Sequence, residues 1–464
     1  IQAAINAASN GNTIKVCPGV YVENVTVDKT LSILGPNATI DPNTGTRVAE
    51  AIVLPAVTET SVQSSASGTV FRVGTGSGHI DATIAGFTID GHNAALTNGR
   101  TLNGVEIHTA SGIVTSPGSI DVETVGFDVK LTATYNIIQN LERYGVYLAG
   151  VSNGSTVLSG NDVSYNKFDN LPSGNNFGGD RGRAAAFGWG VYGTFSHNVA
   201  TRVNVGWQDD NHYLASTGAG TLVDNNEIHA YHRGIFHNLQ YGTATAATIT
   251  NNTLIAETNG DFPASSTNFG IELASIQNTV GANVANNNIS GHVYGYLLWN
   301  MPTTTAINIA GGTLNNNQYG VFATSQDPQF GAASQSVNAS VSGLTITNSA
   351  IAGITVSDTP ATSATALGIS NVTISGSPTG IATIGANASA SVTGSTVSGA
   401  NSAGLNVGAT GGATTASCNA FYSNGVGALT SSGAYATLTL TNNSIVGNTV
   451  GVSQTTGSTL TANG

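Results

Sequence analysis

The segment NNEIHAYHRGIFHN, residues 225–238, decides the fold, because its pattern recurs along the rest of the chain. It contains a polar turn, a short alternating run, a glycine and a second alternating run. Five more segments align with it, namely NNNISGHVYGYLLWN (286–300), GTLNNNQYGVFATS (312–325), LTITNSAIAGITVS (344–357), STVSGANSAGLNVG (395–408) and NSIVGNTVGVSQ (443–454). A repeat of roughly 20–50 residues indicates stacked supersecondary units.

Ten glycines mark the repeat, and most of them follow one another after 23 to 28 residues. They are Gly206, Gly234, Gly270, Gly295, Gly320, Gly353, Gly380, Gly404, Gly427 and Gly451. Alternating runs this short do not make independent sheets, but stacked coils bury a continuous core. The repeat therefore predicts an all-β parallel β-helix of about 17 coils. We expect the glycines to turn the chain at positive φ, and Asn226, Asn288 and Asn316 to form an amide ladder.

The expected domain organisation is one β-helix over residues 1–464. A helix at Ile1–Ala8 belongs to an N-terminal cap at 1–12, and 168–186 reads as an inserted loop. Residues 330–464 are Thr-, Ser-, Asn- and Gly-rich coils that carry no charged side chain after Asp358, and we expect no C-terminal cap on them. An uncapped last coil exposes unpaired backbone groups, and three alternatives remain open: the solenoid continues in a further part of the protein, it abuts another subunit, or its end is solvated.

Charge and composition exclude several classes of partner. The chain has 12 basic and 24 acidic residues, a net charge of −12, and no Lys or Arg after Arg233. Nucleic acid binding requires clustered Lys and Arg, so we expect none. No apolar run reaches the roughly 18 residues of a membrane span. Cys17 and Cys418 are too far apart in a solenoid to form a disulfide, and we expect both to be buried.

The N-terminal stretch IQAAINAASNGNTIKVCPGVYVENVTVDKTLSILGPN (1–37), together with the repeats that follow it, resembles the opening of the pectate-lyase-like right-handed parallel β-helix superfamily. The resemblance implies a right-handed solenoid, a helix that caps the open core, and a secreted or cell-surface location, bacterial by class. The superfamily includes lyases, hydrolases, epimerases, tailspikes and adhesins, so the resemblance implies a fold more than a function.

Residues 180–240 carry the densest group of His, Arg and Trp side chains. Paired Asp209 and Asp210, with His232 one coil later, resemble in part the polygalacturonase-type hydrolases. In that resemblance one carboxyl group protonates the leaving oxygen and the other activates water. We expect Trp207 to point inward, and Gln208, Phe236 and Glu272 outward. The residues expected to bind substrate are Arg143, Trp207, Gln208, Arg233, Phe236, His237 and Glu272.

Two functions remain open, and the sequence leaves it uncertain whether the protein is an enzyme. The first is an extracellular or cell-surface β-helical scaffold for adhesion, assembly or glycan contact, with a polysaccharide, a cell-surface glycan or its own copies as partner. The alternative is a carbohydrate-active enzyme, an inverting hydrolase or a lyase-like enzyme, with its groove at 180–272. An Arg-x-Lys motif is missing downstream, since no basic residue follows Arg233. We expect no cofactor and no metal, because His229, His232 and His237 need not converge.

Overall fold

The computed structural model describes residues 1–464 except 61–67, 77, 117–125, 151–157, 172–183, 211–219, 241–245, 259–267, 277–279, 302–306, 327–335, 359–362, 410, 432–435 and 464. The single domain expected from the repeat divides into two compact units. Unit 1 is Ile1–Thr248 with Glu257–Ala264, and unit 2 is Ile249–Ala256 with Ser265–Gly464. The strand β22 (Ala247–Thr250) spans the sequence boundary between them.

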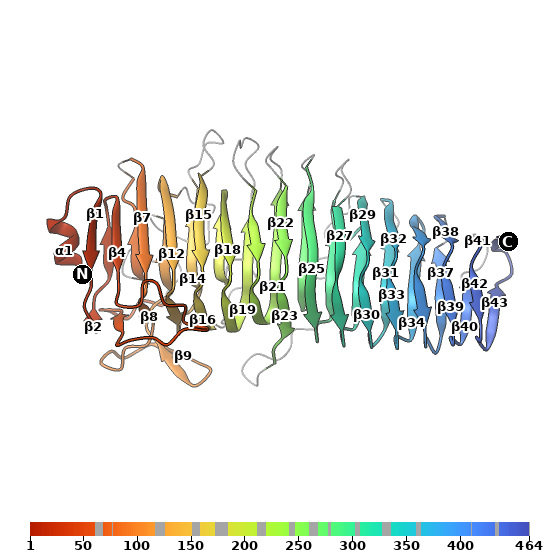
Figure 1. The fold of residues 1–464 in the computed structure, drawn as a ribbon, viewed down its shortest axis with the longest axis horizontal. Helices are drawn as coiled ribbons and strands as arrows, with labels where there is room; N and C mark the ends of the chain where they lie inside the picture. The colour runs from red at the N-terminus through yellow and green to blue at the C-terminus, as the bar shows by residue number, and fades with distance from the viewer. Residues whose placement is uncertain are drawn as a thin grey trace. The chain divides into compact units, whose positions relative to one another are not determined.

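In unit 1, parallel strands of successive coils pair side by side in three sheets (Figure 1). The first sheet contains β1 (Asn12–Lys15), β4 (Leu31–Leu34), β7 (Ile80–Ala85), β12 (Val129–Thr134), β15 (Leu158–Ser164), β18 (Val191–Ser196) and β20 (Leu222–Asp224). The second contains β2 (Gly19–Val22), β5 (Ala51–Leu54), β8 (Thr88–Asp90), β13 (Ile137–Gln139), β16 (Lys167–Leu171) and the first halves of β19 (Val199–Asp210) and β21 (Glu227–Gln240). The third contains β3 (Val25–Val27), β6 (Thr69–Val73), β11 (Ser111–Val114), β14 (Tyr144–Ala149), β17 (Ala184–Trp189) and the second halves of β19 and β21.

Unit 2 has the same three sheets. The first contains the first halves of β25 (Ala282–Ser290) and β27 (Ile307–Asn315), then β29 (Val337–Ser342), β32 (Thr365–Ser370), β35 (Ala388–Thr393), β38 (Ala413–Ser417), β41 (Thr437–Thr441) and β44 (Thr459–Asn463). The second contains β23 (Thr253–Ala256), the second halves of β25 and β27, β30 (Thr345–Thr347), β33 (Thr373–Ser375), β36 (Thr396–Ser398), β39 (Ala420–Tyr422) and β42 (Ser444–Val446). The third contains β24 (Phe269–Ile276), β26 (Tyr294–Trp299), β28 (Tyr319–Thr324), β31 (Ala352–Asp358), β34 (Thr379–Gly385), β37 (Ala403–Ala409), β40 (Val426–Thr430) and β43 (Val450–Gln454).

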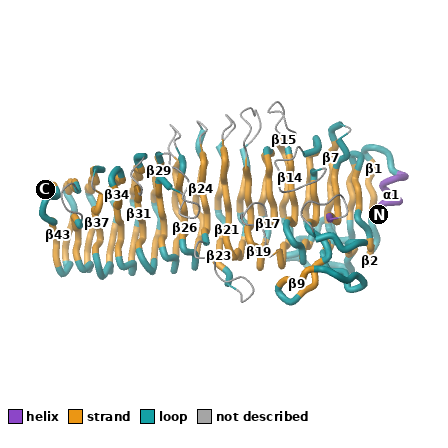
Figure 2. Tube along the Cα trace, turned by 180° about the vertical axis from the view of Figure 1, so that it is seen from behind, coloured by secondary structure: helices purple, strands orange, loops and turns teal. Residues whose placement is uncertain are grey.

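Two elements of unit 1 stand apart from the sheets. The strands β9 (Arg100–Leu102) and β10 (Val105–Ile107) form an antiparallel pair that lies to one side of the stacked strands (Figure 2). The helix α1 (Gln2–Ala7) lies against β3 and is the one helix among the residues that the structure describes. Of the apolar positions expected on one helix face, Ile5 is fully buried, whereas Ile1 and Ala8 are partly exposed.

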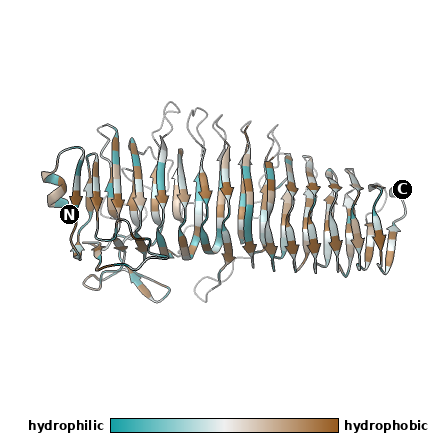
Figure 3. Cartoon of the chain, viewed as in Figure 1, coloured by the Kyte–Doolittle hydropathy of each residue, from teal (hydrophilic) through white to brown (hydrophobic). Residues whose placement is uncertain are grey.

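Side chains alternate between the core and the solvent along the first sheet. In β12 the residues Val129, Leu131 and Ala133 are buried, and the residues between them are exposed or half-buried. Figure 3 shows the same change of hydropathy along individual strands. This alternation follows from the pleat, which directs successive side chains to opposite faces. The interior is therefore filled by aliphatic and aromatic side chains from all three sheets.

The repeat glycines serve a purpose other than the expected one. None of the ten has a positive φ. At most of them there is no room for a side chain: a Cβ on Gly206 would lie 2.5 Å from the carbonyl oxygen of Gly234 and 2.5 Å from Cγ2 of Ile228. The absence of a Cβ lets the third sheet approach the second closely at this corner. Gly451 is an exception, because a Cβ there would meet no atom closer than 3.9 Å.

The paired asparagines of the turns fill two distinct positions. Asn225 has a φ of 54° and makes the left-handed turn. Asn226 is buried, donates from Nδ2 to the carbonyl of Phe195 at 2.9 Å, and accepts from the Nδ2 of Asn198 at 3.0 Å. The amide ladder therefore includes Asn226 as expected, but Asn316 occupies the left-handed position (φ 55°) and Asn288 lies on β25 beside Thr313. The expected register was off by one residue in those two coils.

Two further expectations require correction. Cys17 and Cys418, both expected to be buried, are exposed free thiols. Cys418 occupies a left-handed turn position (φ 58°), which directs its side chain outward. Both ends of the expected 168–186 loop are strand residues, since 168–171 belong to β16 and 184–186 to β17. Residues 172–183 lie outside the described part of the chain.

Candidate functional site

From β11 to β21, the third sheet of unit 1 differs from the first because its outer face is also buried. Every residue of β14 is buried, and so is the second half of β19 from Val203 to Asp210. The outward positions Gln208 and Phe236 were expected to face solvent, but Gln208 is 2% and Phe236 9% exposed. Their strands pair in register, with Gln208 beside Phe236, as the repeat predicts.

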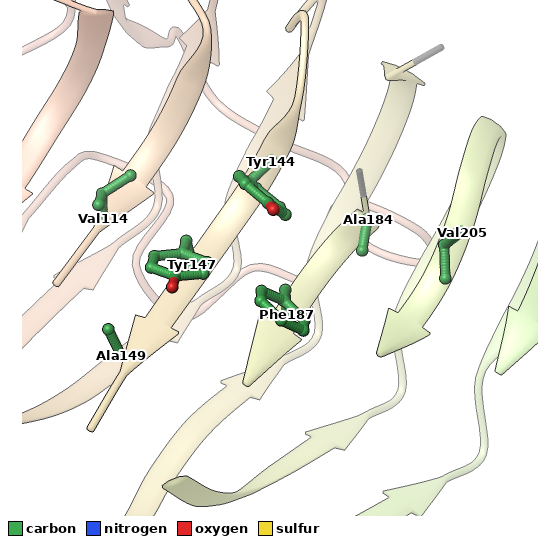
Figure 4. Packing of buried hydrophobic residues seen from close by; sticks show 7 residues of the cluster. All are labelled: Val114, Tyr144, Tyr147, Ala149, Ala184, Phe187 and Val205. Atoms are coloured by element: carbon green, nitrogen blue, oxygen red, sulfur yellow. The ribbon is translucent and has the colours of Figure 1, made fainter. Parts of the chain in front are cut away.

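An aromatic cluster occupies the first part of this outer face. The rings of Tyr144, Tyr147 and Phe187 lie against one another (Figure 4), with centroids 5.0 to 5.6 Å apart. Trp189 extends the cluster, 6.2 Å from Phe187. Sequence reasoning missed these four residues. The usable signal was an aromatic residue directly before the repeat glycine and another three positions later, as in Tyr144-Gly-Val-Tyr147.

The row at the carboxyl ends of the strands contains Trp189, Asp210 and Asn238. Trp189 pairs in register with Asp210, and Asp210 pairs with Asn238. Asp210 Oδ1 accepts a hydrogen bond from Asn238 Nδ2 at 2.9 Å, and Oδ2 accepts from Gln208 Nε2 at 3.1 Å. Asp210 is 7% exposed, and Trp189 and Asn238 are half-buried. A ring, a carboxylate and an amide therefore succeed one another across three coils.

Asp209 lies on the opposite, inner face of the same strand. Its two carboxylate oxygens lie 2.9 and 3.0 Å from Nδ1 of His237, its register partner, and Thr221 donates to Oδ2 at 3.2 Å. All three residues are buried. Because neighbouring residues of a strand point to opposite faces, the structure does not bring the carboxylates of Asp209 and Asp210 to one point.

Trp207 also points inward, as expected, so it is not presented to the outer face. Its ring stacks on Phe195 of β18 with centroids 5.3 Å apart, and the residue is 1% exposed. The indole fills the coil interior, where such a large ring buries substantial apolar area.

The expected basic and imidazole groups lie at the corner where the second sheet meets the third. Arg233 donates to Nδ1 of His232 at 3.0 Å, and its guanidinium lies 4.4 Å from the ring centroid of Phe236. Burial, together with the positive charge of Arg233, holds the pKa of His232 well below its usual range, so this imidazole is neutral near pH 7. Arg143 is buried at the corresponding corner of an earlier coil, directly before Tyr144.

Glu272 belongs to unit 2, on the outer side of β24. It is 1% exposed rather than facing solvent, and its Oε1 accepts from the indole N–H of Trp299 at 2.8 Å.

A more exposed charged cluster lies on the second sheet of unit 1, on the strands β16 and β19. Arg202 binds Asp169 through two hydrogen bonds, Nε to Oδ1 at 2.9 Å and the terminal nitrogen to Oδ2 at 2.6 Å. The backbone N–H of Arg202 donates to Glu257 at 2.7 Å. Burial raises the pKa of Glu257, although the charges of His229 and Arg202 oppose the shift.

Among the described residues, no group of three or more His, Cys, Asp or Glu side chains is placed to hold a metal ion. Within the described part of the chain there is also no helix of the length and apolarity that a membrane span requires.

Comparison with known proteins agrees with this architecture. Residues 301–464 match the family described as "Right handed beta helix region". This match, in the second half of the chain, agrees with the right-handed parallel β-helix fold expected from the sequence. No curated protein matches the sequence.

Several solved structures are similar to this chain. DFA-IIIase from Arthrobacter chlorophenolicus A6 is 17% identical, with a TM-score of 0.36, over 75% of this chain and 90% of that one. The mannuronan C-5 epimerase AlgE6 A-module from Azotobacter vinelandii is 13% identical, with a TM-score of 0.33, over 99% and 94%. The siphovirus 9NA tailspike receptor binding domain is 9% identical, with a TM-score of 0.36, over 100% and 74%.

Proposed function

We propose that this protein is an extracellular β-helical scaffold that contacts a glycan through the row Trp189, Asp210 and Asn238 in unit 1. The observation that carries the proposal is the register of this row, which aligns an aromatic ring, a carboxylate and an amide on one outward face. Sugar sites combine apolar ring surface with a few fixed polar groups. Gln208 and Asn238 hold the carboxylate of Asp210 in place, so little ordering is left for the moment of binding.

The buried aromatic cluster next to the row makes the row rigid. Tyr144, Tyr147 and Phe187 pack against one another beside Trp189, and the ring of Trp189 therefore rests on a firm base. Arg233 adds a fixed positive charge on the same sheet, held against Phe236. Rigid support of contact residues is what precise recognition requires.

Affinity electrophoresis through gels that contain neutral or acidic polysaccharides tests the proposal. The wild-type chain should be retarded by at least one polysaccharide. Trp189→Ala and Asp210→Asn should each weaken retention about tenfold, the effect of losing roughly 1.4 kcal/mol. Tyr422→Ala is the matched control, because that ring is 42% exposed and belongs to unit 2, whereas the row belongs to unit 1. Equal retention of all four proteins would refute the assignment.

A second candidate is a carbohydrate-active enzyme, an inverting hydrolase or a lyase-like enzyme, in which Asp209, Asp210 and His232 carry the reaction. The observation that favours it is the buried pair of Asp209 and His237. His237 Nε2 is buried and has no hydrogen-bond partner among the described residues, a feature more typical of reactive sites than of cores. The carboxylate on the outer face of β19 is that of Asp210.

Release of reducing ends, and of unsaturated products detected by ultraviolet absorbance, tests the enzyme candidate on the same polysaccharides. Asp210→Asn is the informative variant, because Asp210 lies outside the coil interior and its loss leaves the core intact. Turnover that disappears in Asp210→Asn while the unfolding temperature is unchanged would favour the enzyme. Retention without turnover in the wild-type chain would favour the scaffold.

Location and self-association belong to the same proposal. A bacterial cell surface suits a chain with few charges, and end-to-end association of copies suits the exposed apolar side chains of β43, where Val450 is 43% and Val452 38% exposed. Fractionation of the producing cells tests the location. Sedimentation at increasing concentration tests association, which should weaken when both valines are replaced by Lys.

A further inference from the structure

We propose that unit 2 carries a second glycan-binding face, on the outer side of β24, β26 and β28, and that its ligand is an uncharged polysaccharide. This inference extends the proposed function to a separate site and rests on it only for the class of ligand. The face is formed by Tyr294, Tyr319, Phe322 and Trp299, all of them half-buried.

The first support is the arrangement of the rings. Tyr294 and Tyr319 stack with centroids 5.4 Å apart and planes 13° apart, and Phe322 lies 5.0 Å from each at a steep angle. The two tyrosine rings cover each other's faces, and Phe322 adds apolar surface beside them. Burial, with a contribution from Tyr319, raises the pKa of Tyr294, so its hydroxyl remains a donor at neutral pH.

The second support is the fixed position of Trp299. Its indole N–H is held by Glu272 at 2.8 Å, and Glu272 is itself 1% exposed. Register pairing then places Thr324 beside Trp299 and Ser357 beside Thr324, so hydroxyl groups continue the row. An oriented indole followed by hydroxyls matches the apolar and polar sides of a sugar ring.

The third support is a buried hydroxyl without a partner. Thr355 pairs in register with Phe322 on the outer side of β31 and is 1% exposed. Its Oγ1 makes no hydrogen bond within the described part of the chain. An unsatisfied buried polar group destabilises the structure, and a ligand hydroxyl would offset that cost.

Charge selects the class of glycan. Unit 2 contains no Lys or Arg, because none follows Arg233 in the sequence. Its described carboxylates, Glu272 and Asp358, are both buried and hydrogen-bonded, the second to Ser325 and to the backbone of Asn387. An acidic polysaccharide would have to give up hydration of its carboxylates to a face that offers no cation. A neutral polysaccharide has no such cost.

The experiment compares retention of the full chain in gels that contain a neutral glucan, mannan or fructan with gels that contain alginate or polygalacturonate. Retention by at least one neutral polysaccharide should be independent of salt concentration between about 20 and about 500 mM, because the ligand carries no charge that salt could screen. The double variant Tyr294→Phe/Tyr319→Phe keeps the ring stack and removes both hydroxyls, and it should weaken retention at least threefold. Trp299→Phe should weaken it further, and Tyr422→Ala should leave it unchanged.

The outcomes separate this inference from the proposed function. Normal retention of the unit 2 variants, together with loss in Trp189→Ala, would overturn the inference and leave unit 1 as the glycan site. Loss in the unit 2 variants with normal retention of Trp189→Ala would support the inference and count against the unit 1 row. Retention by acidic polysaccharides alone, or by none, would overturn it. Circular dichroism of each variant excludes loss of fold as the cause.

Discussion

Nδ1 of His237 lies 2.9 and 3.0 Å from the two carboxylate oxygens of Asp209, which precedes it by one coil and faces the same interior. Neither residue is accessible to solvent. This pair connects β19 and β21 from inside the coil, whereas Asp210 and Asn238 connect the same strands on the outer face. Polar contacts therefore join the two strands on both sides.

Removing one member of the inner pair should be costly. His237→Leu leaves the carboxylate of Asp209 buried without its main partner, and we expect a loss of about 3–5 kcal/mol in the free energy of unfolding. The double variant Asp209→Leu/His237→Leu should lose less than the sum of the single variants. His229→Leu is the control, because His229 is partly exposed, and should change stability by no more than about 0.5 kcal/mol. Urea unfolding measures all four; a change below about 1 kcal/mol in His237→Leu would show that the pair is dispensable.

The two asparagines of one turn should respond differently to substitution. Asn226→Ala removes the acceptor of the Asn198 backbone N–H and the donor to the Phe195 carbonyl, both buried. We expect a loss of about 2–4 kcal/mol from these two groups. Asn225→Gly keeps the left-handed turn, since glycine adopts positive φ freely, and should be nearly neutral. Thermal unfolding of both variants decides; equal losses would contradict the assignment of two roles.

Close approach at the repeat glycines predicts intolerance of even one methyl group. Gly206→Ala would place a Cβ 2.5 Å from backbone oxygen and from Ile228, and we expect a loss of about 1–3 kcal/mol. Gly368→Ala is the matched control within a strand, because its nearest neighbour would lie at 3.5 Å. Denaturant midpoints for the two variants should differ clearly. Coincident midpoints would mean that the corner relaxes without cost.

Glu257 should make unit 1 slightly less stable as the pH rises. Its pKa is raised above the ordinary value of 4.5, so the folded state retains this proton more strongly than the unfolded chain does. That contribution is fully present below pH 4.5 and is lost as the pH rises through the raised pKa. Glu257→Gln should therefore match the wild type near pH 4 and exceed its stability near pH 7, by less than about 1 kcal/mol because the group is partly solvated. Unfolding curves at both pH values test this, and a constant difference would rule it out.

The repeat was sufficient to predict the coils, and even the register of single residues. Gly206 aligns with Gly234, and Asp209 with His237, as the spacing implies. Periodicity specifies these features because every coil must satisfy the same backbone pairing and the same core. The assignment of the amide ladder failed in two coils, where adjacent asparagines differ only in backbone conformation. A sequence repeat does not show which of two identical residues makes the left-handed turn.

The candidate site was harder to predict than the fold. Alternation gave the inward direction of Trp207 correctly, but it equated the outward face with solvent, and Gln208, Phe236 and Glu272 are buried. The proximity of Asp209 and Asp210 in sequence suggested one carboxylate pair, whereas the pleat directs them to opposite faces. Trp189 was recognised as part of the Trp-containing segment 180–240 but was not assigned to the site, because its register could not be counted through the expected loop at 168–186.

The absence of basic residues after Arg233 has a consequence for proteolysis. Trypsin cleaves only after Lys and Arg, so residues 234–464 contain no peptide bond that it can cut. Digestion of the native or even the denatured chain should thus leave that whole segment as one fragment. All of unit 2 lies within this segment, so it can be recovered in one step by an enzyme that reduces most of unit 1 to peptides.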